Sequence, residues 1–236
     1  MTWSIVARDG SGALGIAIAS RFFAVGALCL HIRSGIGAVA TQALVNPMYG
    51  PRVLDALEAG RSPQEAIAAV TAEDGGREHR QVHAVSAGGR TFAHTGSACV
   101  EWCGATAGEA FSVAGNMLAG AQVIEATANA WRANESLAFA ERLIEALAAG
   151  DAAGGDKRGK QAAALLVHTT EDYAAIDIRV DDHAEPIAEL RRLHAKSLER
   201  FQPFSAFLPT RANPMGTTDR AVIEAGIERF HAQRGR

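Results

Sequence analysis

Residues 2–21 read TWSIVARDGSGALGIAIASR, and this segment decides the fold. The DGSG stretch at residues 9–12 contains two X-Gly pairs of the kind that favour the positive φ angles of a short turn. It separates residues 2–8 from residues 13–21, where isoleucines alternate with small residues as in a strand packed under helices. The segment therefore predicts a β-hairpin with Thr2 as the first residue of its first strand.

Thr2 follows Met1, and a threonine is small enough for the preceding methionine to be removed after translation. Removal would place a hydroxyl group and a free α-amine on one residue. Such an amine has a pKa of about 7.7–8.0, so near neutral pH it can accept the hydroxyl proton. A threonine activated by its own amine is an established covalent nucleophile. The alternative is that Thr2 is an ordinary β-branched residue that opens a strand.

The remaining chain alternates between strand-like and helix-like patterns. We expect strands at 27–32, 38–41, 81–86, 90–94, 108–114, 162–168 and 174–180, and helices at 51–59, 63–72, 119–133, 137–149, 186–201 and 220–233. A capping box at residues 62–65 begins the second helix, Gly150 ends the fourth, and Asp219 caps the last. Helix pairs between groups of strands are typical of a layered α+β domain.

Short motifs along the chain match those of a known family. They are TWSIVARD at 2–9, ASRFFAVG at 19–26, ATQA at 40–43, NP at 46–47, YG at 49–50, GNML at 115–118, GGD at 154–156, RG at 158–159, Gln161 and VDDH at 180–183. Together they resemble the bacterial and archaeal family numbered 1028 among domains of unknown function, which is grouped with the N-terminal-nucleophile (Ntn) hydrolases. The match runs from about Thr2 to about Leu193.

This resemblance implies an α+β fold, the four-layer αββα sandwich of Ntn proteins, with a C-terminal helical extension. We expect the sandwich at residues 1–195. Residues 196–236 lie beyond the strongest match, and we expect them to form an arm that packs on the domain or on a partner subunit. The hairpin also resembles the start of proteasome-type subunits, but Ala19 stands where those carry an aspartate, and no lysine lies between Arg8 and Lys157. Their complete mechanism therefore cannot be transferred.

Three amide side chains are candidates to stabilise an oxyanion if Thr2 attacks a carbonyl group. Asn116 follows Gly115 near the end of an expected strand, and Gln42 and Asn46 follow another. We predict a catalytic role for Asn116 and substrate binding for the other two. The alternative is that these amides cap turns and the next helix.

Four further residues are predicted to bind substrate. Arg21 ends the second strand and can bind a carboxylate or lower the pKa of the Thr2 amine; alternatively it satisfies loop carbonyls. Ser20 can contact the amine or act as a turn or core hydroxyl. Asp156 and Arg158 either form a salt bridge within their loop or provide partners for charged substrate groups.

Composition excludes several other functions. The net charge is −3 with Lys and Arg spread along the chain, which argues against nucleic-acid binding. We expect no membrane segment, no export signal, reduced cysteines and hence a cytoplasmic protein. The sequence predicts no cofactor and no metal, because Asp181, Asp182 and His183 have no second histidine at suitable spacing.

Two functions remain open at this point. One is an Ntn-type amidohydrolase that acts on a small-molecule amide through Thr2. The other is a non-catalytic ligand-binding or assembly protein on the same scaffold, which the missing aspartate and lysine favour. Gly- and Ala-rich helix faces favour a homo-oligomer such as a dimer.

Overall fold

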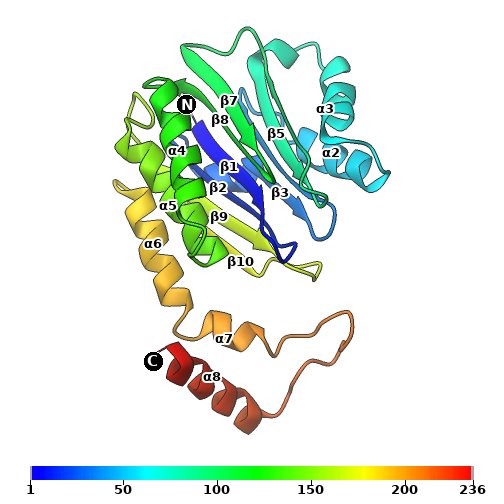
Figure 1. The fold of residues 1–236 in the computed structure, drawn as a ribbon, viewed down its shortest axis with the longest axis vertical. Coiled ribbons are helices and arrows are strands. Elements are labelled where there is room, and N and C mark those ends of the chain that lie inside the picture. Colours follow the sequence, from blue (N-terminus) through cyan, green and yellow to red (C-terminus); the bar gives the residue numbers. More distant parts are fainter. Residues whose placement is uncertain (1, 235–236) are drawn as a thin grey trace. The chain divides into compact units, whose positions relative to one another are not determined.

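The computed structural model describes residues 2–234 and shows a mixed α+β fold with two antiparallel sheets (Figure 1). The larger sheet has the strand order β10-β9-β2-β1-β8-β7, and the smaller has the order β3-β4-β5-β6. The strands of the larger sheet are β1 (Thr2–Arg8), β2 (Leu14–Ser20), β7 (Trp102–Gly108), β8 (Phe111–Leu118), β9 (Ala162–His168) and β10 (Ile176–Val180). Those of the smaller sheet are β3 (Leu30–Arg33), β4 (Gly37–Ala43), β5 (Arg80–Ser86) and β6 (Thr91–Thr95).

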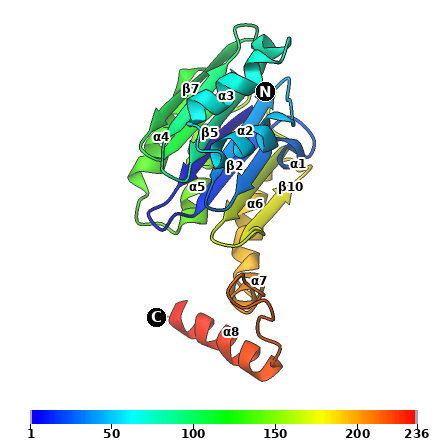
Figure 2. The same cartoon turned by 90° about the vertical axis from the view of Figure 1, so that its right-hand side faces the viewer.

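Two pairs of helices cover the two sheets on opposite sides, while β1, β2 and β8 face β4 and β5 across the interior (Figures 1 and 2). Helices α2 and α3 pack against the smaller sheet, and α4 and α5 pack against the larger one. The helices are α1 (Val25–Cys29), α2 (Tyr49–Glu58), α3 (Pro63–Ala72), α4 (Ala121–Ala133), α5 (Phe139–Ala152), α6 (Pro186–Ser197), α7 (Phe201–Ser205) and α8 (Arg220–Arg234).

The first hairpin is confirmed, with β1 and β2 paired from Thr2 opposite Ser20 to Arg8 opposite Leu14. The Asp9 carboxylate accepts hydrogen bonds from the backbone N–H groups of Ser11 and Ala13, each at 2.9 Å, which closes the turn. Gly12 has a φ of 95°, a conformation that suits glycine. Turn chemistry in the sequence therefore sets the register of the central strands.

The two helix starts predicted from capping residues, at Pro63 and Arg220, are also confirmed. Ser62 accepts a hydrogen bond from the Glu65 backbone N–H, and the Glu65 carboxylate accepts one from the Ser62 N–H, which completes the capping box. Asp219 accepts a hydrogen bond from the Ala221 N–H at 2.9 Å at the start of α8. These local signals depend only on neighbours in sequence, which is why pattern alone finds them.

Several expectations are wrong. The strand expected at 27–32 is the short helix α1 followed by β3, and β7 was not expected at all. Strand β8 begins at Phe111 and continues through Leu118, so Asn116 lies within it rather than beyond its end. Gly150 does not end α5; a Cβ there would lie 2.7 Å from Trp3 Nε1, so glycine allows the helix to approach the sheet closely.

The interior between the sheets is apolar over much of its length. Val6, Leu14, Ile16, Ala38, Ala40 and Val85 form one buried cluster between the sheets. Under the other face of the larger sheet, Trp3 is fully buried and donates from Nε1 to the Leu147 carbonyl oxygen at 3.3 Å. This burial anchors β1 on both faces and fixes the position of its first residue.

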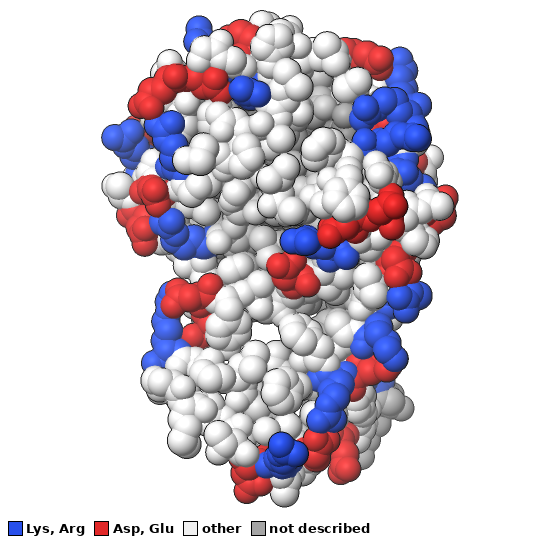
Figure 3. All heavy atoms as spheres, turned by 180° about the vertical axis from the view of Figure 1, so that it is seen from behind, with Lys and Arg blue, Asp and Glu red and all other residues white. Residues whose placement is uncertain are grey.

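The chain divides into two compact units, residues 2–190 and residues 191–234 as described. Within the second unit, Arg200 forms an ion pair with Glu224 at 2.6 Å, and Ile223 and Ile227 of α8 are buried. On the face drawn in Figure 3, Lys and Arg are interspersed with Asp and Glu among the described residues. None of the described helices has the length and apolar character needed to cross a bilayer.

Candidate functional site

Three candidate residues form a row across the end of the larger sheet. Thr2 pairs with Ser20 of β2 on one side and with Asn116 of β8 on the other. Because directly opposed residues of antiparallel strands project from the same face, all three side chains face the smaller sheet. Thr2 Oγ1 and Ser20 Oγ are 3.0 Å apart and hydrogen-bonded, and both residues are buried. The hairpin and strand register thus bring together residues separated by more than a hundred positions.

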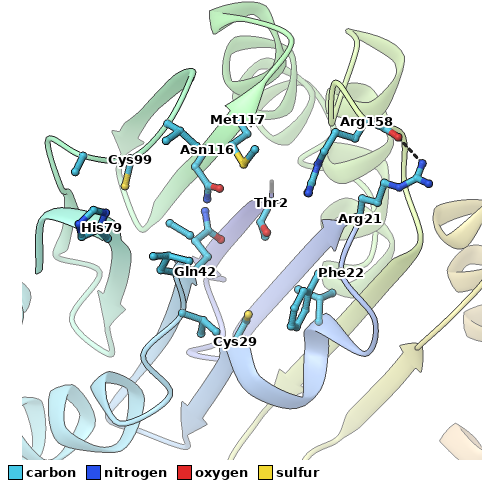
Figure 4. Close-up of a pocket in the computed structure, with 16 residues that line it drawn as sticks. Thr2, Arg21, Phe22, Cys29, Gln42, His79, Cys99, Asn116, Met117 and Arg158 are labelled. Atoms are coloured by element: carbon cyan, nitrogen blue, oxygen red, sulfur yellow. Dashed lines mark hydrogen bonds between the residues drawn. The ribbon is translucent and has the colours of Figure 1, made fainter. Parts of the chain in front are cut away.

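Thr2 lies in a cavity of about 350 Å³ between the ends of the two sheets. Figure 4 shows Thr2 surrounded by side chains from both sheets, from α1 and from the loops beside them. The lining residues are Thr2, Arg21, Phe22, Val25, Cys29, Gln42, Ala43, Leu44, Val45, His79, Ala98, Cys99, Val100, Asn116, Met117 and Arg158. Their character is mainly apolar with a few polar groups around Thr2, which is typical of a small-molecule site.

The amides of Asn116 and Gln42 are held in fixed orientations beside Thr2 (Figure 4). Asn116 Nδ2 donates to Gln81 Oε1 at 3.1 Å, and Gln42 Nε2 donates to the same oxygen at 2.8 Å. Within residues 2–234, each of these NH₂ groups donates one hydrogen bond, to Gln81 Oε1. Each group therefore has a second N–H available for a ligand. Two amide donors are therefore prepared at the cavity wall.

The orientation of the Gln81 amide is fixed by the hydrogen bonds of its NH₂ group. Its Nε2 donates to Thr95 Oγ1 at 2.9 Å and to the carbonyl oxygens of Gly104 and Gly115 at 3.2 and 2.9 Å. These acceptors determine which end of the amide carries the nitrogen, so Oε1 must face Gln42 and Asn116. Gln81 is fully buried and couples β5 to the larger sheet.

A second branch of this network leads into the interior. Ser4 Oγ donates to Gln42 Oε1 at 2.7 Å and lies 2.8 Å from His83 Nε2. His83 Nδ1 lies 3.1 Å from Ser112 Oγ. Burial lowers the pKa of His83 to about 3, so the ring is neutral near pH 7. Because Ser4 donates its proton to Gln42, it accepts from His83 Nε2, and Ser112 donates to Nδ1.

The loop after α5 places one arginine at the cavity and anchors a second. The buried Asp156 carboxylate accepts from the backbone N–H groups of Arg21 at 3.2 Å and Arg158 at 2.8 Å, and from Arg158 Nη2 at 3.4 Å. Arg21 Nη1 donates to the Arg158 carbonyl oxygen. In Figure 4 the Arg158 side chain extends toward Thr2, whereas the Arg21 guanidinium is directed away from it.

The structure does not bring Asn46 into the cavity. Its Nδ2 donates to the Asp74 carboxylate at 3.1 Å, and its Oδ1 accepts from the Met48 N–H at 3.1 Å. Asp74 also accepts from Tyr49 Oη at 2.8 Å and from the Gly76 N–H, and these hydrogen bonds hold the pKa of its carboxyl below the usual range. Asn46 thus holds the loop beside the lining residues, as in the alternative given for it above.

Two cysteines line the cavity, but neither is a reactive thiolate. Burial raises the pKa of Cys29 to about 12, and burial also raises the pKa of Cys99. Both thiols are therefore protonated near neutral pH, and the hydroxyl group among the described lining residues is that of Thr2. Residues 2–234 contain no group of three or more His, Cys, Asp or Glu side chains arranged to hold a metal ion.

Strained backbone conformations occur close to the cavity. Among the described residues, five non-glycine positions have positive φ angles, and Ala43 (71°) and Met117 (55°) line the cavity directly. Ala24 and Glu101 each adjoin a lining residue, while Ala110 lies in a distant turn. Such conformations cost about 1–3 kcal/mol each and tend to occur at functional sites.

Gln81, His83 and Ser112 were not found from the sequence. In the pattern RQVHAVS the polar residues alternate with apolar ones, which is also typical of an ordinary strand with one solvated face. What distinguishes these residues is that both faces of β5 are covered and its polar side chains point inward, toward the other sheet. Only the packing of one sheet on the other reveals this.

Comparisons with known proteins identify the family of this chain. A model of the family of unknown function DUF1028 matches residues 2–190. The crystal structure of protein SPO2555 from Silicibacter pomeroyi, also matched to DUF1028, is similar with a TM-score of 0.86 and 32% identity, covering 93% of this chain and 96% of that one. Anbu (ancestral beta-subunit) from Yersinia bercovieri aligns with a TM-score of 0.38 and 12% identity, over 83% and 94% of the two chains. No curated protein matches. The chain belongs to the DUF1028 family.

Proposed function

We propose that this protein is an Ntn-type amidohydrolase, on the four-layer αββα scaffold of that superfamily, which cleaves a small amide. The observation that carries the proposal is the position of Thr2 inside the cavity, with the Ser20 hydroxyl at 3.0 Å and two oriented amides in the same wall. Removal of Met1 would expose the α-amine of Thr2 at this point. The nucleophile and its base would then belong to one residue.

The proposed reaction begins when Thr2 Oγ1 attacks the substrate carbonyl carbon and its proton passes to the α-amine. The carbonyl oxygen becomes an oxyanion, which the free N–H groups of Asn116 and Gln42 stabilise. The protonated amine returns the proton to the substrate nitrogen as the C–N bond breaks, and the amine product departs. Water, deprotonated by the α-amine, then attacks the acyl-threonine ester and releases the acid.

Ser20 contributes a hydrogen bond to Thr2 Oγ1 rather than a second nucleophile. Ser20 lies on β2 directly opposite Thr2, where its hydroxyl reaches Thr2 Oγ1. Asp156 acts at a distance by ordering Arg21 and Arg158. No step in this scheme requires a metal or an organic cofactor.

Intact mass and covalent labelling test the proposal. We expect purified protein to lack the mass of Met1, and a β-lactone probe to acylate the peptide that begins with Thr2. Thr2→Ala abolishes labelling, and Thr2→Ser, which keeps a hydroxyl beside the amine, retains it. Retention of Met1 by fully folded protein, or labelling that survives in Thr2→Ala, would refute the proposed nucleophile and favour a ligand-binding role.

A further inference from the structure

The charges at the cavity have one sign. Of its described lining residues, the two that carry a full charge at neutral pH are Arg21 and Arg158, and none is acidic. The carboxylate that pairs with Arg158 is Asp156, which lies behind it, has a fully buried side chain and does not line the cavity. The Arg158 guanidinium contacts Asp156, whereas the Arg21 guanidinium contacts a carbonyl oxygen, so this corner has two positive charges for one carboxylate and favours an anion.

Arg158 is the better placed of the two arginines to meet a ligand. Its guanidinium has five N–H donors, and the contact with Asp156 at 3.4 Å occupies one of them. The side chain is 46% exposed and extends toward Thr2 in Figure 4. Arg21 donates to the Arg158 carbonyl oxygen and supports this loop from the side away from Thr2. A ligand in the cavity can therefore place a carboxylate at Arg158 and a carbonyl group beside Thr2.

The remaining walls are mainly apolar and extend to the surface. Phe22, Leu44 and Val100 line the cavity and are 50%, 62% and 56% exposed. In the first unit, the other exposed large apolar side chains are Phe23, Leu28, Met48 and Tyr173, and all but Tyr173 belong to the same segments as the lining residues. Exposed apolar groups gathered at one place indicate a ligand or partner that covers them.

We propose that the substrate is an amide that carries an apolar chain on one side of the scissile bond and a carboxylate on the other, as in an N-acylated amino acid. Arg158 binds the carboxylate, and the walls around Phe22, Val25 and Leu44 hold the chain. This inference rests on the proposed function for the reaction, but the binding preference stands on the cavity alone. The volume of about 350 Å³ is at the low end of the range for small ligands, which favours one short or medium chain.

Calorimetry on the Thr2→Ala variant measures binding without turnover. The probes are N-acetylglycine, N-hexanoylglycine, N-octanoylglycine and the uncharged N-octanoylglycinamide. We expect each added methylene to tighten binding up to about fourfold until the walls are filled. The neutral amide binds about tenfold or more weakly than its acid, because it lacks the charge-assisted hydrogen bond.

Two substitutions of Arg158 test whether its positive charge or its guanidinium geometry causes the preference for the acid. In the Thr2→Ala background, Arg158→Gln removes the preference for the acid over the neutral amide, and Arg158→Lys keeps part of it. Arg61→Gln, at an exposed arginine beyond the end of α2 and outside the cavity lining, leaves the preference unchanged. Urea unfolding of each variant establishes that the protein is folded.

The possible outcomes distinguish the two proposals. Equal binding of acid and neutral amide, or no dependence on chain length because a second copy covers the apolar rim, overturns the substrate class. The expected binding pattern without hydrolysis by the processed wild-type protein supports the substrate class and refutes the amidohydrolase. Hydrolysis of small neutral amides at the same rate as the acylglycines supports the enzyme and refutes the substrate class.

Discussion

The space between the two sheets has two ends built by the same strands but with opposite chemistry. Along β1, Thr2 and Ser4 are followed on the same face by Val6. On β5, Gln81 and His83 are followed by Val85. One end is a polar hydrogen-bonded network beside the cavity, and the other is an apolar core.

The apolar end mainly stabilises the fold, whereas the polar end orients the groups of the candidate site. Burial of the apolar cluster removes hydrocarbon from water and stabilises the fold without directional requirements. Burial of amides and a histidine is unfavourable unless every hydrogen bond is made, so the polar end tolerates few arrangements. The orientation of Asn116 and Gln42 depends on that restriction. Mutations at the two ends should therefore change different properties.

The largest effect on stability is expected at the apolar end. Ile16→Ala leaves a cavity between the sheets and lowers the free energy of unfolding by about 2–5 kcal/mol. Urea unfolding measures this loss, and the rate of β-lactone labelling of folded protein should stay within about twofold of wild type. A large fall in labelling by folded Ile16→Ala would show that the two ends are not separate.

Gln81→Leu should have the largest effect on catalysis among residues outside the cavity lining. It removes the oxygen that orients both amides, and loss of an oxyanion donor costs about 10²–10³ in rate, or about 2.7–4 kcal/mol. The expected loss is in kcat with KM little changed, measured with the best acylglycine found.

Gln81→Glu is the matched control, because it keeps an acceptor oxygen for Asn116 and Gln42 while losing the donors to Thr95 and the strand carbonyls. Its kcat should fall less than that of Gln81→Leu. If both variants lose stability but retain full kcat, Gln81 is a structural residue and the amides are oriented by other contacts.

The neutral His83 gives the polar end a characteristic pH dependence. Its pKa is about 3 in the folded protein and near 6.5 when unfolded, so below pH 6.5 the unfolded state binds a proton that the folded state does not. Its contribution to stability is complete above pH 6.5 and is lost as pH falls toward 3, by up to about 1.4 kcal/mol per pH unit.

Urea unfolding between pH 7 and pH 4 measures this slope. His83→Gln removes the titrating group, so the difference in slope between wild type and variant isolates the histidine from the carboxylates. Equal slopes in the two proteins would mean that His83 has the same pKa in the folded and unfolded states, and would contradict the lowering of its pKa by burial.

Sequence and structure agree where the signal is local and differ where it depends on packing. The DGSG turn fixes the register that brings Thr2 opposite Ser20, and the capping box at Ser62 marks its helix. The five-residue helix α1 is too short to give a helical periodicity, so its apolar residues were interpreted as a strand. Asn46 was placed at the site because its amide follows the same expected strand as Gln42, a position that suits a substrate contact and a turn cap equally.

The polar network shows the same limit more clearly. Asn116 and Gln42 were selected because amides are oxyanion donors, and both line the cavity. Gln81 has the same chemistry, yet nothing in its own segment indicates that its strand is covered on both faces. The groups that orient a site are thus harder to predict than the groups that contact the ligand, because their partners come from another sheet.

Ser112→Ala should give the smallest effect and shows how far the network extends. Ser112 lies farthest along the hydrogen bonds from the cavity, beyond His83, Ser4 and Gln42. Loss of its hydrogen bond to His83 Nδ1 should lower stability by about 0.5–1.5 kcal/mol. Since Gln42 is still held by Ser4 and Gln81, kcat should change less than threefold. A loss of kcat close to that of Gln81→Leu would mean that Ser112 also helps to orient the amides. The part of the interior needed for catalysis would then extend past His83 toward the apolar cluster.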